Sequence, residues 1–232
     1  MHYDAIIFDY DGTIVDTESY HYHAVDHLIK HHYAVALDLE TFFLTYCGLD
    51  DRAVLKLILK SLGKTFTEDD IDRLMREKKS YFAELVRSSK IKTFPGMLPL
   101  IRLASQQRIP LAIATNSSRD DFDITFEQVN NGRLAQRIKT TVTADDVTHK
   151  KPHPEPYLSA AKKLHINPER CLVFEDSLSG IHSAKAAGMH VIALTTSHPK
   201  EELHEADQVI TDASNINLSE LLEKGIPHGQ PS

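Results

Sequence analysis

The sequence predicts an α/β fold in which a parallel β-sheet carries helices on both faces and a small α-helical cap domain is inserted near its start. Short continuous apolar runs, such as 5–8, 111–114 and 171–174, alternate with helix-length segments. This alternation is typical of parallel sheets that are buried on both faces. Between the first and second runs, residues 17–90 show amphipathic helical patterns only, so we expect an all-helical insertion there.

The predicted core elements follow the chain order. Residues 5–8 form a run as long as a buried strand, and the run ends at the polar turn Asp9–Gly12. Further strands are expected at 111–114, 138–142 (a weaker pattern), 171–174, 190–194 and 209–210, and helices from about 119, over 154–164 and over 178–187. The predicted core is therefore Rossmann-like.

The predicted cap contains helices over 51–62 and 68–86, separated by breaks at Gly48 and Gly63. Thr67 and the acidic residues that follow it form a typical helix start. We expect the core domain to span residues 1–15 and 92–232 and the helical cap domain to span residues 16–91. The two connections, around 13–17 and 90–94, are then expected to act as hinges.

Composition narrows the classes of protein. The chain has 232 residues, 41% of them hydrophobic, and a formal net charge of −7 without a Lys/Arg block, which argues against a nucleic-acid partner. Cys47 and Cys171 are far apart and are interpreted as reduced thiols of a cytoplasmic protein. The N-terminus lacks a signal-peptide pattern, and the early apolar run is too short to span a membrane. The oligomeric state is left open, and a monomer is compatible with the sequence.

Polar side chains follow the predicted strands where each strand ends. Asp9 and Asp11 follow the first strand, Thr115–Ser117 the second and Glu175–Asp176 the fourth, and Lys151 precedes a helix. Because ligands bind at the carboxyl ends of parallel strands, we expect these side chains to share one site.

The chemistry of this set indicates phosphate transfer. Crowded carboxylates disfavour one another's ionisation, and a hard cation such as Mg²⁺ removes that cost. Asp9 is the candidate nucleophile that forms a phospho-aspartate, and Asp11 is the candidate acid and base. Lys151, the Thr115 hydroxyl and the cation would neutralise charge on the transferred phosphoryl group.

Four motifs make the resemblance to a family specific. Phe8-Asp9-Tyr10-Asp11-Gly12-Thr13, Thr115-Asn116-Ser117, Lys151-Pro152 and Phe174-Glu175-Asp176-Ser177 occur in this order. They resemble the four motifs of the haloacid dehalogenase-like (HAD) hydrolase superfamily. The helical insertion and its start at Asp16–His21 are similar to the cap of the subgroup that contains β-phosphoglucomutase and many sugar-phosphate phosphatases.

The resemblance implies roles for individual residues. It implies that Mg²⁺ binds the Asp9 carboxylate, the Asp11 backbone carbonyl and the Asp176 carboxylate, with Glu175 as a nearby acid. It also implies that Thr115 and Lys151 hold the phosphate. The remaining candidates for contact with phosphate or substrate in the core are Gly12, Thr13, Asn116 and Ser117.

Cap residues are assigned less directly. The resemblance places His21 at the cap's mouth near the leaving group. Arg52, Lys78 and Lys79 either clamp a distal anionic group of the substrate or are solvated helix charges. His23, His27 and His31 recur at helical spacing, and a polar helix face is a better interpretation of them than a metal site.

The predicted function is a Mg²⁺-dependent phosphatase that hydrolyses small phosphorylated metabolites, such as sugar or polyol phosphates. The nearest alternative is a β-phosphoglucomutase-like phosphosugar mutase, although Thr13 and Asp16–Glu18 look more like the phosphatases. An alternative of another class is a non-catalytic phospho-receiver module. Such modules are shorter and have no helical cap after the first strand.

Overall fold

The computed structural model describes residues 2–46 and 49–226. Its strands are β1 (Ala5–Phe8), β2 (Val15–Asp16), β3 (Lys92–Thr93), β4 (Leu111–Ala114), β5 (Thr140–Val142), β6 (Cys171–Glu175), β7 (His190–Leu194) and β8 (Gln208–Ile210). The α-helices are α1 (Glu18–Tyr33), α2 (Leu39–Tyr46), α3 (Asp51–Ser61), α4 (Glu68–Arg87), α5 (Met97–Gln106), α6 (Arg119–Phe126), α7 (Glu155–Leu164), α8 (Leu178–Ala186) and α9 (Leu218–Lys224). Short 3₁₀ helices occupy Val129–Gly132, Ala144–Asp146 and Pro168–Arg170.

A six-stranded sheet forms the centre of the core, in the order β5-β4-β1-β6-β7-β8, and every neighbouring pair is parallel. β1 lies in the middle, between β4 and β6. The carboxyl ends of β4, β1 and β6 therefore lie side by side at one edge of the sheet, which is where α/β folds of this type bind ligands.

The two faces of the sheet are covered by different helices. Ile6 and Phe8 of β1 point to the face that carries α5, α6 and α9, whereas Ala5 and Ile7 point to the face that carries α7 and α8. All four side chains are fully buried, which explains why the strand appears in the sequence as a continuous apolar run. The predicted fold class is confirmed.

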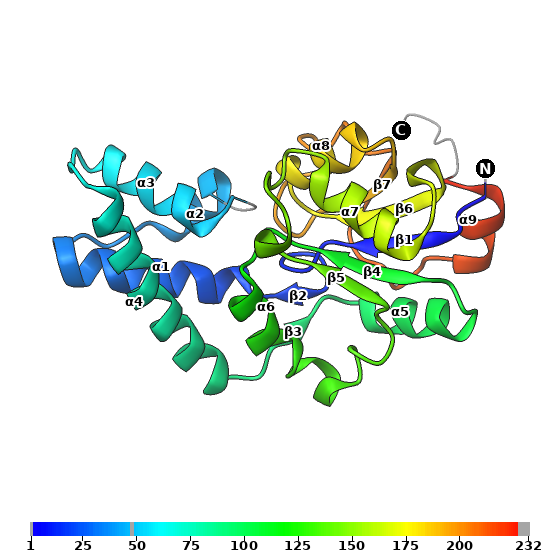
Figure 1. Cartoon of the computed structure of the whole chain (residues 1–232), viewed down its shortest axis with the longest axis horizontal. Coiled ribbons are helices and arrows are strands. Elements are labelled where there is room, and N and C mark those ends of the chain that lie inside the picture. The colour runs from blue at the N-terminus through cyan, green and yellow to red at the C-terminus, as the bar shows by residue number, and fades with distance from the viewer. Residues whose placement is uncertain (1, 47–48, 227–232) are drawn as a thin grey trace.

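Helices α1–α4 gather at one end of the molecule, away from the sheet, and α4 packs against α6 of the core (Figure 1). They have a hydrophobic core of their own, which includes Ile29, Leu55 and Leu74. The predicted helical insertion after the first strand is thus present. α4 begins as expected at Thr67, which forms a reciprocal capping box with Asp70.

The chain passes between the helical cap and the core through two short strands that pair with each other. β2 and β3 form an antiparallel ladder in which Val15 pairs with Thr93 and Asp16 with Lys92. These strands were not predicted, because two-residue strands carry no periodicity and arise here from pairing between distant segments.

The other differences from the predicted elements are small. The strands expected at 138–142 and 209–210 occupy 140–142 and 208–210, and α2, α5 and α9 were not predicted. Cys171 is a free, buried thiol, whereas Cys47 and Gly48 lie outside the described residues. Among the residues with described positions, no helix is long and apolar enough to cross a membrane.

Candidate active site

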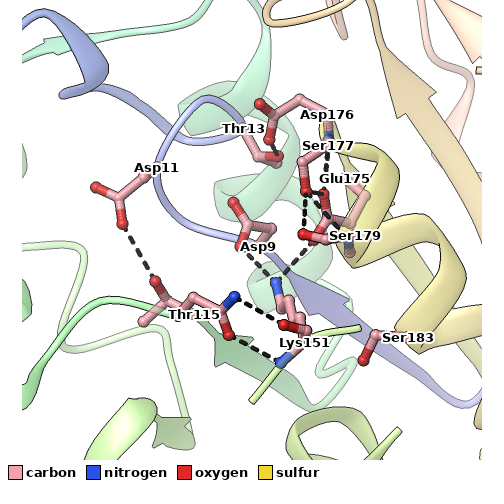
Figure 2. Close-up of polar contacts among 12 residues, drawn as sticks. Asp9, Asp11, Thr13, Thr115, Lys151, Glu175, Asp176, Ser177, Ser179 and Ser183 are labelled. Atoms are coloured by element: carbon pink, nitrogen blue, oxygen red, sulfur yellow. Dashed lines mark hydrogen bonds and ion pairs between the residues drawn. The ribbon is translucent and has the colours of Figure 1, made fainter. Parts of the chain in front are cut away.

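The floor of the site is an ion-pair network at the ends of β1 and β6 (Figure 2). The Lys151 ammonium lies 2.5 Å from Asp9 Oδ1 and 2.7 Å from Glu175 Oε1. All three side chains are buried, with Asp9 7% and Glu175 0% exposed. The other Asp9 oxygen, Oδ2, accepts no hydrogen bond from the described residues, so it is available to a substrate.

Glu175 acts as the anchor of this network. Its Oε1 accepts from Lys151 and from the Tyr157 hydroxyl at 2.9 Å, and its Oε2 accepts from the backbone N–H groups of Asp176 and Ser177. The carboxylate lies so close to α8 that a Cβ on Gly180 would be 1.5 Å from Oε1. Glu175 therefore positions Lys151, and only glycine fits beside it.

The carboxylates outnumber the positive charge. Ligand oxygens of Asp9, Glu175 and Asp176 lie within 4.8 Å of one another, and Lys151 is the cation in contact with them. Burial and the neighbouring carboxylates raise the pKa values of Asp9 and Asp176 well above their usual range, although Lys151 opposes the shift at Asp9. Burial also raises the pKa of Glu175, but Lys151 and the two backbone N–H groups together lower it by more. The net shift of the Glu175 pKa is therefore downward.

An oxygen-only donor set with this charge excess fits a hard divalent cation. Asp9 and Asp176 are the two members whose ionisation is disfavoured, so they are the residues that would gain most from Mg²⁺. Glu175 is already saturated with hydrogen bonds, and the geometry gives it less to offer a metal.

The turn after β1 brings Gly12 and Thr13 against Asp176. Thr13 Oγ1 donates to Asp176 Oδ1 at 2.6 Å, and the Ser197 hydroxyl donates to Oδ2. Gly12 has φ +81°, and a Cβ there would lie 2.0 Å from Asp176 Oδ2. Gly12 is thus required by its backbone conformation and by the approach of this carboxylate.

Asp11 belongs to the same pocket, but other partners hold its carboxylate. Its Oδ2 accepts from Ser117 Oγ at 2.6 Å and from Thr115 Oγ1 at 3.1 Å. Its Oδ1 accepts from the hydroxyl of Thr17, the residue that precedes α1 of the cap. Figure 2 shows Asp11 and Asp9 on opposite sides of the loop that joins them. The Asp11 carboxylate therefore accepts hydrogen bonds both from the core and from the start of the cap.

Asn116 contacts the chain around Lys151. Its Oδ1 accepts from the Lys151 backbone N–H at 3.0 Å, and its Nδ2 donates to the Lys151 carbonyl at 3.3 Å. This pair of bonds fixes the backbone that carries the buried ammonium. Asn116 also lines the pocket, together with Thr115 and Ser117.

A pocket lies above this floor, between the sheet and the cap. From the core it is lined by Asp9, Asp11, Thr115, Asn116, Ser117, Lys151, Asp176 and Ser177. From the cap it is lined by Glu18, His21, Phe42, Tyr46, Leu49, Asp51 and Val54. The structure therefore brings the four sequence motifs together at one pocket, and it places His21 on the cap side of it.

His21 belongs to a buried polar cluster. The Lys78 ammonium lies 2.9 Å from His21 Nδ1, 2.6 Å from an Asp51 oxygen and 3.2 Å from an Asp121 oxygen. Lys78 is 0% exposed, and its charge also faces the Phe82 ring. Lys78 is thus enclosed behind His21 and does not line the pocket.

The other predicted cap residues lie away from the pocket. Arg52 donates to Glu68 and Asp72 on α4, and Lys79 is paired with Asp120 on α6. His27 stacks on Tyr81 at 3.9 Å between ring centroids, as part of the outer face of α1.

Several residues of the site carried no usable signal in the sequence. Tyr157 and Ser197 contact Glu175 and Asp176 from segments outside the four motifs. Asp51 and Asp121 each sit in the first turn of a helix, where acids are common for reasons unrelated to a site. A threonine before the cap helix, Thr17, looks like an ordinary N-cap, yet its hydroxyl binds Asp11.

Comparison with known proteins agrees with the resemblance that the four sequence motifs indicate. The sequence model of the family described as haloacid dehalogenase-like hydrolase matches residues 6–194. Validoxylamine A 7'-phosphate phosphatase of Streptomyces hygroscopicus subsp. limoneus is 31% identical over 214 residues, which cover 92% of this chain and 96% of that protein.

Two solved structures resemble the whole chain. CbbY from Rhodobacter sphaeroides, in complex with xylulose-(1,5)bisphosphate, superposes with a TM-score of 0.84 at 26% identity, covering 94% of this chain and 97% of the other. A β-phosphoglucomutase from Clostridium difficile superposes with a TM-score of 0.84 at 26% identity, covering 96% and 97%.

Proposed function

The chain belongs to the haloacid dehalogenase-like hydrolase family, and from this membership and the geometry of the pocket we propose that it is a Mg²⁺-dependent phosphatase. Its substrates are small phosphomonoesters, with sugar or polyol phosphates as the first class to test, and the reaction passes through a phospho-aspartate at Asp9. The observation that carries the proposal is the hydrogen bonding of the Asp9 carboxylate. Lys151 holds one oxygen of this buried carboxylate, and the other oxygen accepts no hydrogen bond from the described part of the chain where Asp9 lines the pocket.

The first half-reaction is a displacement at phosphorus. Asp9 Oδ2 attacks the phosphoryl group, the bond to the leaving oxygen breaks, and Asp11 gives that oxygen its proton. Lys151 and the Thr115 hydroxyl contact the phosphoryl oxygens, because both line the pocket beside Asp9. A bound Mg²⁺, held by the carboxylates of Asp9 and Asp176 and the carbonyl of Asp11, would supply the remaining positive charge.

The second half-reaction restores the enzyme. Water attacks the phosphorus of the phospho-aspartate, Asp11 takes the proton from this water, and inorganic phosphate leaves with Asp9 again a carboxylate. Glu175 keeps Lys151 in place through both steps, because its own partners are backbone N–H groups and the buried Tyr157 hydroxyl.

The cap governs access to this chemistry. We propose that the core comprises residues 1–15 and 92–232, that the cap comprises residues 16–91, and that β2 and β3 form the hinge between them. The Thr17 hydroxyl on Asp11 couples the start of the cap to the proposed acid, so cap position and acid position are linked.

The test is the release of inorganic phosphate from a panel of sugar, polyol and nucleotide monophosphates, with and without Mg²⁺. Asp9→Asn should lower turnover by about a thousandfold or more, because it removes the nucleophile, and should retain the circular dichroism spectrum of the wild type. Asp69→Asn, on the exposed first turn of α4, is the matched control and should retain activity. Robust turnover by Asp9→Asn or by metal-stripped enzyme would defeat the mechanism.

A phosphosugar mutase is the second candidate, favoured by the similarity to the solved β-phosphoglucomutase and by His21 in the pocket wall. It would use the same phospho-aspartate and pass the phosphoryl group to a second sugar hydroxyl in place of water. Incubation with β-glucose 1-phosphate and a glucose 1,6-bisphosphate primer separates the two. Free phosphate indicates the phosphatase, and glucose 6-phosphate indicates the mutase.

A further inference from the structure

The two walls of the pocket differ in charge. The core wall contributes Lys151 beneath the phosphate position, whereas the described lining of the cap wall includes no lysine or arginine. The cap wall instead carries the acids Glu18 and Asp51 and the apolar side chains of Phe42, Tyr46, Leu49 and Val54. The undescribed residues between Tyr46 and Leu49 are Cys47 and Gly48, neither of which is a cation.

The basic side chains nearest to this wall are matched by carboxylates. Arg52 follows Asp51 in sequence, but its guanidinium lies 2.5 Å from Asp72 and 2.7 Å from Glu68. On the core side of the mouth, the Lys150 ammonium lies 3.4 Å from Asp50. Lys79 is paired with Asp120. Each of these cations is thus already neutralised by an acid of the protein.

The buried cluster behind His21 adds no positive charge either. Lys78 faces two carboxylates, those of Asp51 and Asp121. Even with His21 protonated, the two positive charges of His21 and Lys78 are matched by these two negative charges. With His21 neutral, the cluster carries a net negative charge. A second anionic group on a substrate would therefore meet no uncompensated cation at the cap wall.

We propose that this cap wall selects phosphomonoesters whose only acidic group is the phosphate that is transferred, carried on an uncharged, hydroxyl-bearing body. This inference rests on the proposed phosphatase function and narrows it. Hydroxyl donors of the body face the Asp51 and Glu18 carboxylates, and its carbon skeleton packs on Leu49 and Val54. A second phosphate or a carboxylate in the same place would lose its hydration without gaining an uncompensated cation in return. Bisphosphates are therefore rejected.

The first experiment compares matched substrate pairs that differ by one acidic group. The pairs are fructose 6-phosphate with fructose 1,6-bisphosphate, glucose 6-phosphate with glucose 1,6-bisphosphate, and 2-hydroxyethyl phosphate with phosphoglycolate. Within each pair, kcat/KM for phosphate release should be lower for the more acidic member by about tenfold or more. Equal or faster hydrolysis of the more acidic members would overturn the inference.

The second experiment places a cation on the wall. Leu49 lines the pocket and is 37% exposed, so Leu49→Lys adds an ammonium there with room for a long side chain. This variant should raise kcat/KM for fructose 1,6-bisphosphate, relative to fructose 6-phosphate, by about tenfold. Leu49→Gln, which is polar and uncharged, should leave the ratio near the wild-type value.

The control for added charge elsewhere lies on α3. Leu57 is 43% exposed and does not line the pocket, so Leu57→Lys changes the net charge without changing the wall. It should leave both activity and the substrate ratio unchanged. An unchanged ratio in Leu49→Lys, or an equal change in Leu57→Lys, would contradict a role for local wall charge.

The two levels of the proposal fail in different ways. If monophosphates release phosphate in a Mg²⁺-dependent, Asp9-dependent reaction while the paired substrates react equally, the selectivity inference alone is wrong. If p-nitrophenyl phosphate and all the monophosphates release no phosphate, the proposed function is wrong and the inference falls with it.

Discussion

The ammonium of Lys78 on α4 lies 3.2 Å from the carboxylate of Asp121 on α6, and both side chains are buried where the cap meets the core. The same ammonium lies 2.6 Å from Asp51 on α3. One lysine therefore joins the cap helices α3 and α4 to α6, the helix that follows the proposed phosphate-binding residues of the core. Charge pairing at this depth makes each partner costly to remove singly.

Lys78→Met should destabilise the protein by about 3–5 kcal/mol, because it leaves the buried Asp121 and the partly buried Asp51 without their common cation. Lys79→Met, one residue later on the same helix, removes an exposed pair with Asp120 and should cost less than about 1 kcal/mol. Urea unfolding of both variants measures the free energies. Similar losses in the two variants would show that burial of the Lys78 pair is unimportant.

The stability contributed by His21 should decline as pH rises. Burial and Lys78 lower the pKa of His21, but Asp51 and Asp11 together raise it by more, so the net shift is upward. A raised pKa means that the folded state favours the proton. The contribution is therefore complete below the unfolded pKa of about 6.5 and is lost as pH passes through the folded value.

The measurement is the difference in the free energy of unfolding between wild type and His21→Gln, followed from acidic to alkaline pH. This difference should shrink with rising pH, while the difference for the exposed His204→Gln serves as the baseline. A His21 difference that is constant, or that grows with pH, would contradict the assignment.

Gly180→Ala should reduce both stability and phosphatase activity. A Cβ at this position would lie 1.5 Å from Glu175 Oε1, so the carboxylate that positions Lys151 must move, at a cost of about 1–3 kcal/mol. Gly63→Ala is the control, because its Cβ meets nothing within 4 Å and only the φ of +66° is strained. It should cost about 1 kcal/mol and leave kcat unchanged. Full activity in Gly180→Ala would show that Glu175 does not position Lys151.

Magnesium should raise the melting temperature of the wild type, because a cation that binds only the folded state stabilises it by about 2.7 kcal/mol at one hundred times its Kd. Asp176→Asn removes one proposed ligand and should lose most of this shift, whereas Asp69→Asn should keep it. Differential scanning calorimetry with Mg²⁺ and with EDTA provides the comparison. An undiminished shift in Asp176→Asn would place the cation elsewhere.

Much of the core could be predicted because its strands are buried on both faces. The apolar run from Ala5 to Phe8 contributes side chains to two hydrophobic clusters, one on each face of the sheet. A continuous apolar run is therefore required there, and it can be recognised in the sequence. α9 was not predicted because it has only seven residues, and α5 was not predicted because a proline lies in its first turn. The β2–β3 pairing depends on a contact between residues 15–16 and 92–93, which local patterns do not contain.

The candidate site was predictable where a motif places the residue at a strand end. Asp9, Thr115 and Glu175 each follow or end a central strand, so the parallel sheet brings them together. The cap side was not predictable in the same way. Whether Arg52 and Lys78 face a substrate depends on the acids that face them, and those acids lie on other helices.

The β2–β3 ladder has one more consequence. Because the chain leaves the core at Val15 and returns to it at Thr93, and these two residues pair across the ladder, the inserted segment begins and ends at nearly the same place. The helices α1–α4 between these two strands are therefore a single insertion in the chain of the core. One inserted domain could therefore replace another during evolution, and change which substrates reach the site, without altering the order of any strand in the sheet.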